Sequence, residues 1–364
     1  MPTREVGRSL PPSGGGGDED RLGDLPDGIL HHILGFLPAP ESVRTCVLAR
    51  RWRHLWKSAT GLRIANLDGG DKLHDFVYHL LLLRGRAPLD TCELKFGGLF
   101  DFDYRDRPVI LWFRHAVLCE VQVLRLQVSW YGAPLHLDGP PLASRHVVKL
   151  ELIDVELAHS FLDFSSCPVL EHLEIARCDL SDAKNISSQS LKRLKIIKCD
   201  FSCNFRTRIR VPNLLSLCLQ DCYYPTPLFE IMPLLVEAFI RVDVLSGDLI
   251  TLYSDSEKCP HDDCDLCRSN TNCVFLQALL QAQNLVLITY DQEFVFKRDL
   301  MRCPTFSNLK TLLLIDCGYV AFDLHGVTGI LGHSPVLEKL TLEFSSKVPG
   351  HEATNSRCVT SHNH

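Results

Sequence analysis

The sequence predicts an α/β fold in which three N-terminal helices precede a solenoid with a curved parallel β-sheet. Helices and loops are expected on the convex side of that sheet. The main observation is an apolar pattern, L-x-x-L-x-[LI], that returns about every two dozen residues between Thr91 and Leu342. A unit of that size cannot bury its own apolar face, so successive units must stack. The second observation is a group of short amphipathic segments within residues 20–67.

The period of the pattern indicates leucine-rich repeats over residues 68–344. Successive anchors from Leu150 to Ala238 lie 23, 21, 23 and 21 residues apart, within the range of such repeats. The interval from Ala238 to Leu285 is 47 residues, which predicts an insert at 253–273. The predicted anchors are Leu94, Leu124, Leu150, Leu173, Leu194, Leu217, Ala238, Leu285, Leu312 and Leu340.

Four repeats end in a cysteine directly after the predicted strand. These residues are Cys178, Cys199, Cys222 and Cys317. A small and weakly polar thiol suits a tightly packed corner where the chain leaves the sheet. Each of these cysteines is alone in its repeat, so we interpret them as corner packing and not as redox or metal residues.

Composition narrows the class of protein. The chain has 364 residues, of which 46% are hydrophobic and 23% charged, as in ordinary soluble proteins. A formal net charge of -6 provides no basic field for nucleic acid. The most apolar stretch, Phe76 to Leu83, is too short to span a membrane. The N-terminus lacks a secretory pattern, so we expect an intracellular protein of the nucleus, the cytoplasm or both, with mostly free thiols.

The N-terminal elements follow from local signals. Residues 1–19 are rich in glycine, proline and acidic residues, which predicts a disordered leader. Pro26 suits the first turn of a helix that continues to Leu37, and prolines at 38 and 40 end it. Two further helices are predicted at about 41–48 and 50–59. A unit this small is marginally stable alone and has more apolar residues than its core can use.

Further along the chain, a helix is predicted at about 72–83 and a strand at about 92–96. The segment 101–107 is predicted to be a loop that leads into another helix. Residues 345–364 are polar and unpatterned, and we expect a disordered tail.

Residues 20–37 and 43–56 resemble an F-box in the form common among plant F-box proteins with leucine-rich repeats. The shared features are Leu25-Pro26, the pattern Ile29-Leu30-x-x-Ile33-Leu34, and Arg51-Trp52. The resemblance implies that residues 20–67 bind the Skp-type adaptor of a cullin ubiquitin ligase. The alternative is a purely structural helical cap on the solenoid. The residues implied as core and adaptor-binding face are Leu25, Pro26, Ile29, Leu30, Ile33, Leu34, Leu37, Val43, Cys46, Leu48 and Trp52.

Two other segments resemble the same plant group. Leu80 to Leu89 and Trp112 to Ala116 are similar to the start of its repeats, and Phe306 to Phe344 to its C-terminal FBD region, here about residues 285–344. The similarity ends after Phe344, so the last repeats are expected to be truncated, leaving an apolar end without a cap.

The insert contains the cysteine cluster with metal-ligand character. The spacing Cys264-x-x-Cys267 suits zinc, but Cys259 and Cys273 have no standard spacing. We therefore keep three interpretations open: a zinc site, a loosely packed loop and a redox pair. The sequence has no nucleophile elbow, phosphate loop or His-Glu-x-x-His motif, and neither catalysis nor a cofactor is expected.

These expectations combine into a non-catalytic substrate receptor of a Skp-cullin-F-box (SCF) ubiquitin ligase, with an unknown target protein. The target would bind the concave strand face or the loops at its rim. The outward positions of the strands are mixed in charge: Glu151, Glu174, Lys195, Cys218 and Thr341. Neither nucleic acid nor a membrane is expected as partner. Two alternatives are a repeat module that acts outside a ligase and a receptor for a small molecule.

Overall fold

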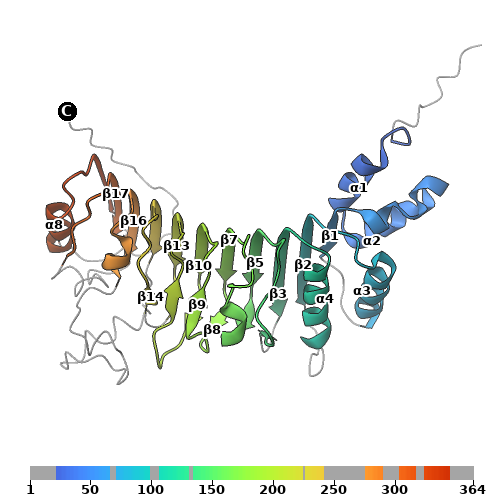
Figure 1. Cartoon of the computed structure of the whole chain (residues 1–364), viewed down its shortest axis with the longest axis horizontal. Helices are drawn as coiled ribbons and strands as arrows, with labels where there is room; N and C mark the ends of the chain where they lie inside the picture. The colour runs from blue at the N-terminus through green and yellow to red at the C-terminus, as the bar shows by residue number, and fades with distance from the viewer. Residues whose placement is uncertain are drawn as a thin grey trace, which may run out of the picture.

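The computed structural model describes residues 22–65, 71–98, 106–130, 134–223, 226–241, 275–289, 303–316 and 324–344. Within these residues, 11 strands pair in parallel to form one large sheet. Figure 1 shows the strands side by side along the long axis, with the N-terminal helices at one end and α8 (Leu324–Gly332) at the other. The predicted α/β solenoid is confirmed. The predicted leader, insert and tail lie outside the described residues.

The large sheet follows the predicted repeats. Its strands are β1 (Gly61–Ile64), β2 (Thr91–Gly98), β3 (Val123–Trp130), β5 (Lys149–Ile153), β7 (His172–Ala176), β10 (Arg193–Ile197), β13 (Ser216–Gln220), β15 (Glu237–Arg241), β16 (Asn284–Thr289), β17 (Thr311–Asp316) and β18 (Lys339–Phe344). The predicted anchors from Leu124 to Leu340 stand in one register across these strands.

The structure corrects the pattern at its N-terminal end. In β2 the residue opposite Leu124 is Cys92, two positions before the predicted anchor Leu94. Cys92, Leu94 and Phe96 all point inward and are buried, so apolar character alone does not fix the register of β2. The sheet also begins with β1, within the segment 20–67 that the sequence assigned to the helices.

The convex side differs between short and long repeats. The repeats of 21–26 residues between β3 and β15 contain short strands and one 3₁₀ turn, η4 (His159–Leu162), in place of α-helices. The strands β4 (Leu135–Leu137), β6 (Val155–Leu157), β8 (Asp179–Leu180) and β11 (Asp200–Phe201) form one small sheet, and β9 (Asn185–Ser187), β12 (Arg208–Arg210) and β14 (Leu228–Phe229) form another. Helices α3 (Asp71–Arg84) and α4 (Asp106–Leu118) occupy the longer intervals before β2 and β3, as predicted.

Directly after each central strand, the chain turns at a residue whose backbone adopts the left-handed conformation. Asp154, Arg177, Lys198 and Asp221 have φ angles of 58°, 52°, 52° and 48°. The amide of each donates to the last carbonyl of the following strand, at 2.7–3.0 Å. The turn then directs the chain into the small sheets, and Cys178, Cys199 and Cys222 are buried there, which confirms their prediction as corner residues.

The N-terminal helices are shorter than predicted. They are α1 (Asp27–Gly35), α2 (Ala39–Arg44) and the 3₁₀ turns η1 (Thr45–Val47), η2 (Arg50–Arg53) and η3 (Leu55–Ser58). The predicted third helix is therefore two 3₁₀ turns, because His54 between them adopts φ −124°, outside the helical range. Among the described residues, no helix is long and apolar enough to cross a membrane.

Candidate functional site

Helix α1 presents apolar side chains on two opposite sides. Leu30 and Leu34 are buried, with Leu30 0% exposed. Ile29 is 48% exposed, and Ile33 and Phe36 are also exposed, as is Leu22 just before the helix. A helix that is apolar on both sides is normally covered on both sides. The exposed side of α1 is therefore a candidate for contact with another protein.

The buried side of α1 packs on the η2 and η3 turns. Trp52, Leu55 and Trp56 come from these turns and are buried in the same core as Leu30 and Leu34. Two tryptophans give this small unit much of its buried area. Because these side chains point inward, they form the core of the helical unit. The exposed side of the unit is formed by Ile29, Ile33 and Phe36.

Arg51 fixes the segment that leads into α1. Its guanidinium donates to the Asp27 carboxylate at 2.6 and 3.0 Å, to the carbonyl of Leu25 at 2.5 Å, and to the carbonyl of Gly23. The planar guanidinium has five donors, which suits this combination of one carboxylate and two carbonyls. Arg51 thus joins η2 to the start of α1 and holds Pro26 and Ile29 in place.

A second exposed apolar group follows α2. Val47 is 82% exposed and Leu48 is also exposed, at the end of η1. Exposed arginines precede and follow them in the sequence, at positions 44, 50 and 53. Apolar side chains bordered by positive charge suit a partner surface that is apolar in the middle and acidic around it.

The large sheet carries a second candidate surface on its outer face. We define the outward column as the residues that alternate with the buried rows and stand opposite one another: Arg63, Glu93, Arg125, Glu151, Glu174, Lys195, Cys218, Phe239, Val286, Leu313 and Thr341. The predicted outward positions are all in this column, but Glu151 is only 8% exposed because it lies between Arg125 and Lys149, with which it pairs.

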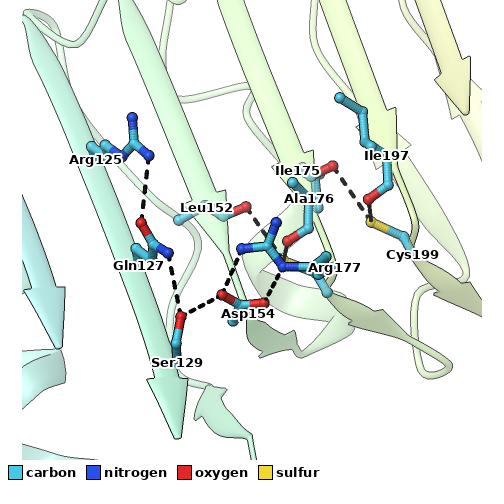
Figure 2. A network of polar contacts seen from close by, with 11 residues as sticks. Arg125, Gln127, Ser129, Leu152, Asp154, Ile175, Ala176, Arg177, Ile197 and Cys199 are labelled. Carbon is cyan, nitrogen blue, oxygen red and sulfur yellow. Dashed lines mark hydrogen bonds and ion pairs between the residues drawn. The ribbon is translucent and has the colours of Figure 1, made fainter. Parts of the chain in front are cut away.

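The N-terminal half of the outward column is a network of ion pairs. Arg125 lies 3.2 Å from Glu151 and 4.0 Å from Glu93, and Lys195 lies 3.7 Å from Glu174. Figure 2 shows how the network continues from Arg125 through Gln127 and Ser129 to the corner residue Asp154. The charges in this half largely neutralise each other.

Asp154 is the best-connected carboxylate of this network. It accepts hydrogen bonds from Ser129 at 2.7 Å and from Arg177 at 2.6 and 2.8 Å (Figure 2). Desolvation acts to raise the pKa of Asp154, but these hydrogen bonds and the charge of Arg177 outweigh it and lower the pKa. Asp154 is therefore a fixed anion at the rim of the outer face.

The C-terminal half of the outward column has no charge. Cys218, Phe239, Val286 and Leu313 stand opposite one another on four adjacent strands, and all four are half-buried. Uncharged side chains of this size on an accessible sheet face are typical of a protein-binding surface. The outward column therefore changes from self-paired charges to apolar contacts between Lys195 and Cys218.

Comparison with known families bears on the helical unit. Residues 22–61 match the family model of the F-box domain. The chain therefore carries an F-box domain at the N-terminal end of its repeat sheet. The match ends at Gly61, the first residue of β1, so the F-box and the sheet adjoin without a linker.

Curated relatives extend the similarity over most of the chain. A rice protein named meiotic F-box protein MOF (Oryza sativa subsp. japonica) is 29% identical, over 89% of this chain and 71% of the relative. An F-box/LRR-repeat protein of Arabidopsis thaliana is 28% identical, over 90% and 92% respectively. An F-box/FBD/LRR-repeat protein of the same plant is 26% identical, over 94% and 80%. These names agree with the resemblances that the sequence shows.

The structure separates the predicted F-box residues into three groups. Leu30, Leu34 and Trp52 are buried, so they belong to the core and not to a contact face. Leu25, Leu37, Val43 and Cys46 are half-buried, and Pro26, Ile29, Ile33 and Leu48 are exposed. The exposed residues Leu22, Phe36 and Val47 were missed. Their apolar character within the motif was the signal that could have identified them.

The structure does not place the candidate zinc ligands. Cys259, Cys264, Cys267 and Cys273 lie outside the described residues. Within the described ranges, no group of three or more His, Cys, Asp or Glu side chains is arranged to hold a metal ion. The zinc interpretation of the insert stays a prediction.

Proposed function

We propose that the chain is the substrate-recognition subunit of an SCF-type ubiquitin ligase. The F-box would bind a Skp-type adaptor and through it a cullin, while the repeats hold a target protein. The observation that carries the proposal is the exposed apolar side of α1, formed by Ile29, Ile33 and Phe36 within an F-box. These side chains are exposed in the isolated chain.

The proposed mechanism is tethering. A target held beside the ubiquitin-charged enzyme reacts at a high effective concentration, so the transfer becomes nearly intramolecular. In this mechanism the chain supplies binding and positioning, and it contributes neither a catalytic residue nor a cofactor. The nucleus and the cytoplasm are the proposed compartments.

The proposed target surface is the outward column. Its apolar half, from Cys218 to Leu313, would provide most of the affinity because buried apolar area drives association. Its N-terminal half would provide specificity, since a partner must match charges that already pair with each other.

The test compares two exposed isoleucines, one in the F-box and one in the repeats. We expect Ile29→Asp to weaken binding of a plant Skp-type adaptor by roughly 30-fold, because burial of such a side chain is worth about 2 kcal/mol. Ile231→Asp is the matched control, since Ile231 is 73% exposed but lies in the repeats. Binding would be measured by calorimetry after co-expression and size-exclusion chromatography.

The outcomes separate the candidate functions. A stoichiometric complex that Ile29→Asp weakens and Ile231→Asp preserves supports the ligase subunit. A folded chain that binds none of several adaptors would overturn it and favour a repeat module that acts outside a ligase.

A further inference from the structure

We infer that the F-box is also the N-terminal cap of the repeat sheet, and that Arg84 holds it there at a fixed angle. Adaptor binding and capping were alternatives for the same helices at the level of sequence. The contacts of β1 support both roles at once, because they are made by Gly35 and Pro38, and by Phe36 through the Arg63 guanidinium 5.7 Å from its ring. They leave Ile29 and Ile33 exposed.

The first step concerns the edge of the sheet. β1 is the terminal strand, and its free edge would offer unpaired backbone groups to another chain. Pro38, between α1 and α2, forms a parallel bridge with Arg63 on that edge. α1 and α2 both contact β1. The F-box thus covers the first strand, as a capping unit of a solenoid must.

The second step concerns the closest approach of the two parts. A Cβ atom on Gly35, at the end of α1, would lie 2.6 Å from the backbone nitrogen of Gly61. A Cβ atom on Gly61 would lie 2.4 Å from the carbonyl oxygen of Gly35. The two backbones therefore touch directly, without a side chain between them, and leave little space for sliding or tilting.

The third step is the role of Arg84. This residue ends α3, is buried, and donates to the carbonyls of Trp56 and Ala59, both at 2.8 Å. These carbonyls belong to the last turn of the F-box and the residue after it. A buried guanidinium that donates to two carbonyls of a neighbouring unit holds the two units together, here α3 and the F-box.

The fourth step is the backbone between the two parts. Thr60 connects the F-box to β1, and its carbonyl accepts hydrogen bonds from Asp90 at 2.7 Å and Thr91 at 3.3 Å. The amide of Thr60 donates to the backbone carbonyl of His31 in α1 at 3.4 Å. One continuous hydrophobic core includes Leu30 of the F-box and the repeats. The F-box and the sheet are therefore one rigid body.

The test measures the distance between the F-box and the repeats in the full chain. A donor and an acceptor dye are attached through genetically encoded amino acids at Arg44 on α2 and Ile231 in the repeats, both exposed. Single-molecule energy transfer then gives the distribution of distances. We expect one narrow distribution for the wild type. A broad distribution in the wild type would overturn the inference, whatever the variants show.

The variants test Arg84 as the positioning residue. Arg84→Met keeps the length of the side chain but removes both hydrogen bonds, so the distribution should broaden. Amide exchange at residues 60–64 should become at least about tenfold faster, as expected for the loss of charge-assisted bonds. Arg84→Lys should restore part of the protection, since one ammonium can still reach a carbonyl.

Two controls keep the result interpretable. Arg86→Met changes a nearby exposed arginine and should leave both measurements at wild-type values. If Arg84→Met fails to fold, Gly61→Ala tests the same joint, and the mean distance should shift because the new methyl group meets the Gly35 carbonyl. An unchanged mean distance in folded Gly61→Ala, or an unchanged width of the distribution in folded Arg84→Met, would contradict the fixed joint.

The inference about the joint between the F-box and the sheet does not rest on the proposed function. The distance measurement uses the chain without adaptor. Loss of adaptor binding would therefore count against the ligase subunit alone, and a mobile joint would count against the cap alone.

Discussion

At the scale of single residues, the corners of the solenoid depend on small buried thiols. Cys199 donates to the carbonyls of Ile175 and Ile197, both at 3.4 Å, and Cys178 makes the same kind of contact one repeat earlier. Burial raises the pKa of Cys222 to about 12, so its thiol is protonated and unreactive at neutral pH. These cysteines are structural parts of the corner.

Enlarging a corner thiol should disrupt the packing. We expect Cys199→Leu to lower the free energy of unfolding by about 1–3 kcal/mol, because added methylene groups have no space in this corner. Cys203→Leu is the control, since Cys203 is a free and exposed cysteine only four positions away. Urea denaturation measures both variants. Equal stability of the two would contradict the packing role.

The Asp154 carboxylate predicts a defined pH dependence. Its pKa is lowered in the folded state, so its stabilising contribution is complete above the unfolded pKa near 4 and is lost as the pH falls through the folded pKa. Asp154→Asn removes the charge but keeps a side chain that tolerates the left-handed backbone. At neutral pH the variant should be less stable by about 0.5–1 kcal/mol, since Arg177 is half exposed and screened by water.

Thermal unfolding between pH 2.5 and pH 7 measures that difference. The gap between wild type and Asp154→Asn should narrow as the pH falls from 4 towards 2.5, because the folded Asp154 carboxylate becomes protonated as the pH approaches its lowered pKa. A gap that stays constant from pH 7 to pH 2.5 would show that packing, and not charge, distinguishes the two side chains.

At the scale of elements, one side of α1 contributes to stability and the opposite side to adaptor binding in the proposed function. Leu30→Ala should lower the free energy of unfolding by about 2–5 kcal/mol, because it opens a cavity in the core. Ile29→Ala should change stability by no more than about 0.5 kcal/mol, since the side chain is largely in water. Adaptor affinity should fall in Ile29→Ala. Urea denaturation measures the stability of both variants, and calorimetry measures their adaptor affinity. A large loss of stability in Ile29→Ala, or none in Leu30→Ala, would contradict this division.

Sequence predicted the elements with a strong period and missed those without one. The repeats from Leu124 onward were assigned correctly because each unit needs the same two or three inward leucines or isoleucines. β1 was missed because four residues, Gly61–Ile64, are too few to show the pattern. The core and the contact face of the F-box were not separable, because the apolar residues of α1 surround the helix and only packing shows which side is covered.

The sequence also did not reveal the division of the outward column. Phe239, Val286 and Leu313 occupy positions between buried apolar residues, where another apolar residue looks like part of the core pattern. Only the register of the strands shows that they share a face with Glu174 and Lys195. Long-range pairing of this kind is not encoded in local spacing.

At the scale of the whole molecule, the F-box and the repeats should not be separable. A chain that starts at residue 68 lacks β1 and therefore loses the buried side chains of Leu62 and Ile64. This should cost about 3–6 kcal/mol and expose the edge of β2. Size-exclusion chromatography and thermal unfolding would detect the association and the lower Tm. A monomeric fragment with an unchanged Tm would contradict a shared core.

The corner amides give the solenoid a direction. The amide of each left-handed residue, from Asp154 to Asp221, finds its acceptor only in the following repeat. A chain that leaves the ribosome N-terminus first therefore has, at every moment, a last repeat whose corner donor is still unpaired. Each newly synthesised strand closes the repeat before it, so folding can advance in step with translation once the helices at the start have formed.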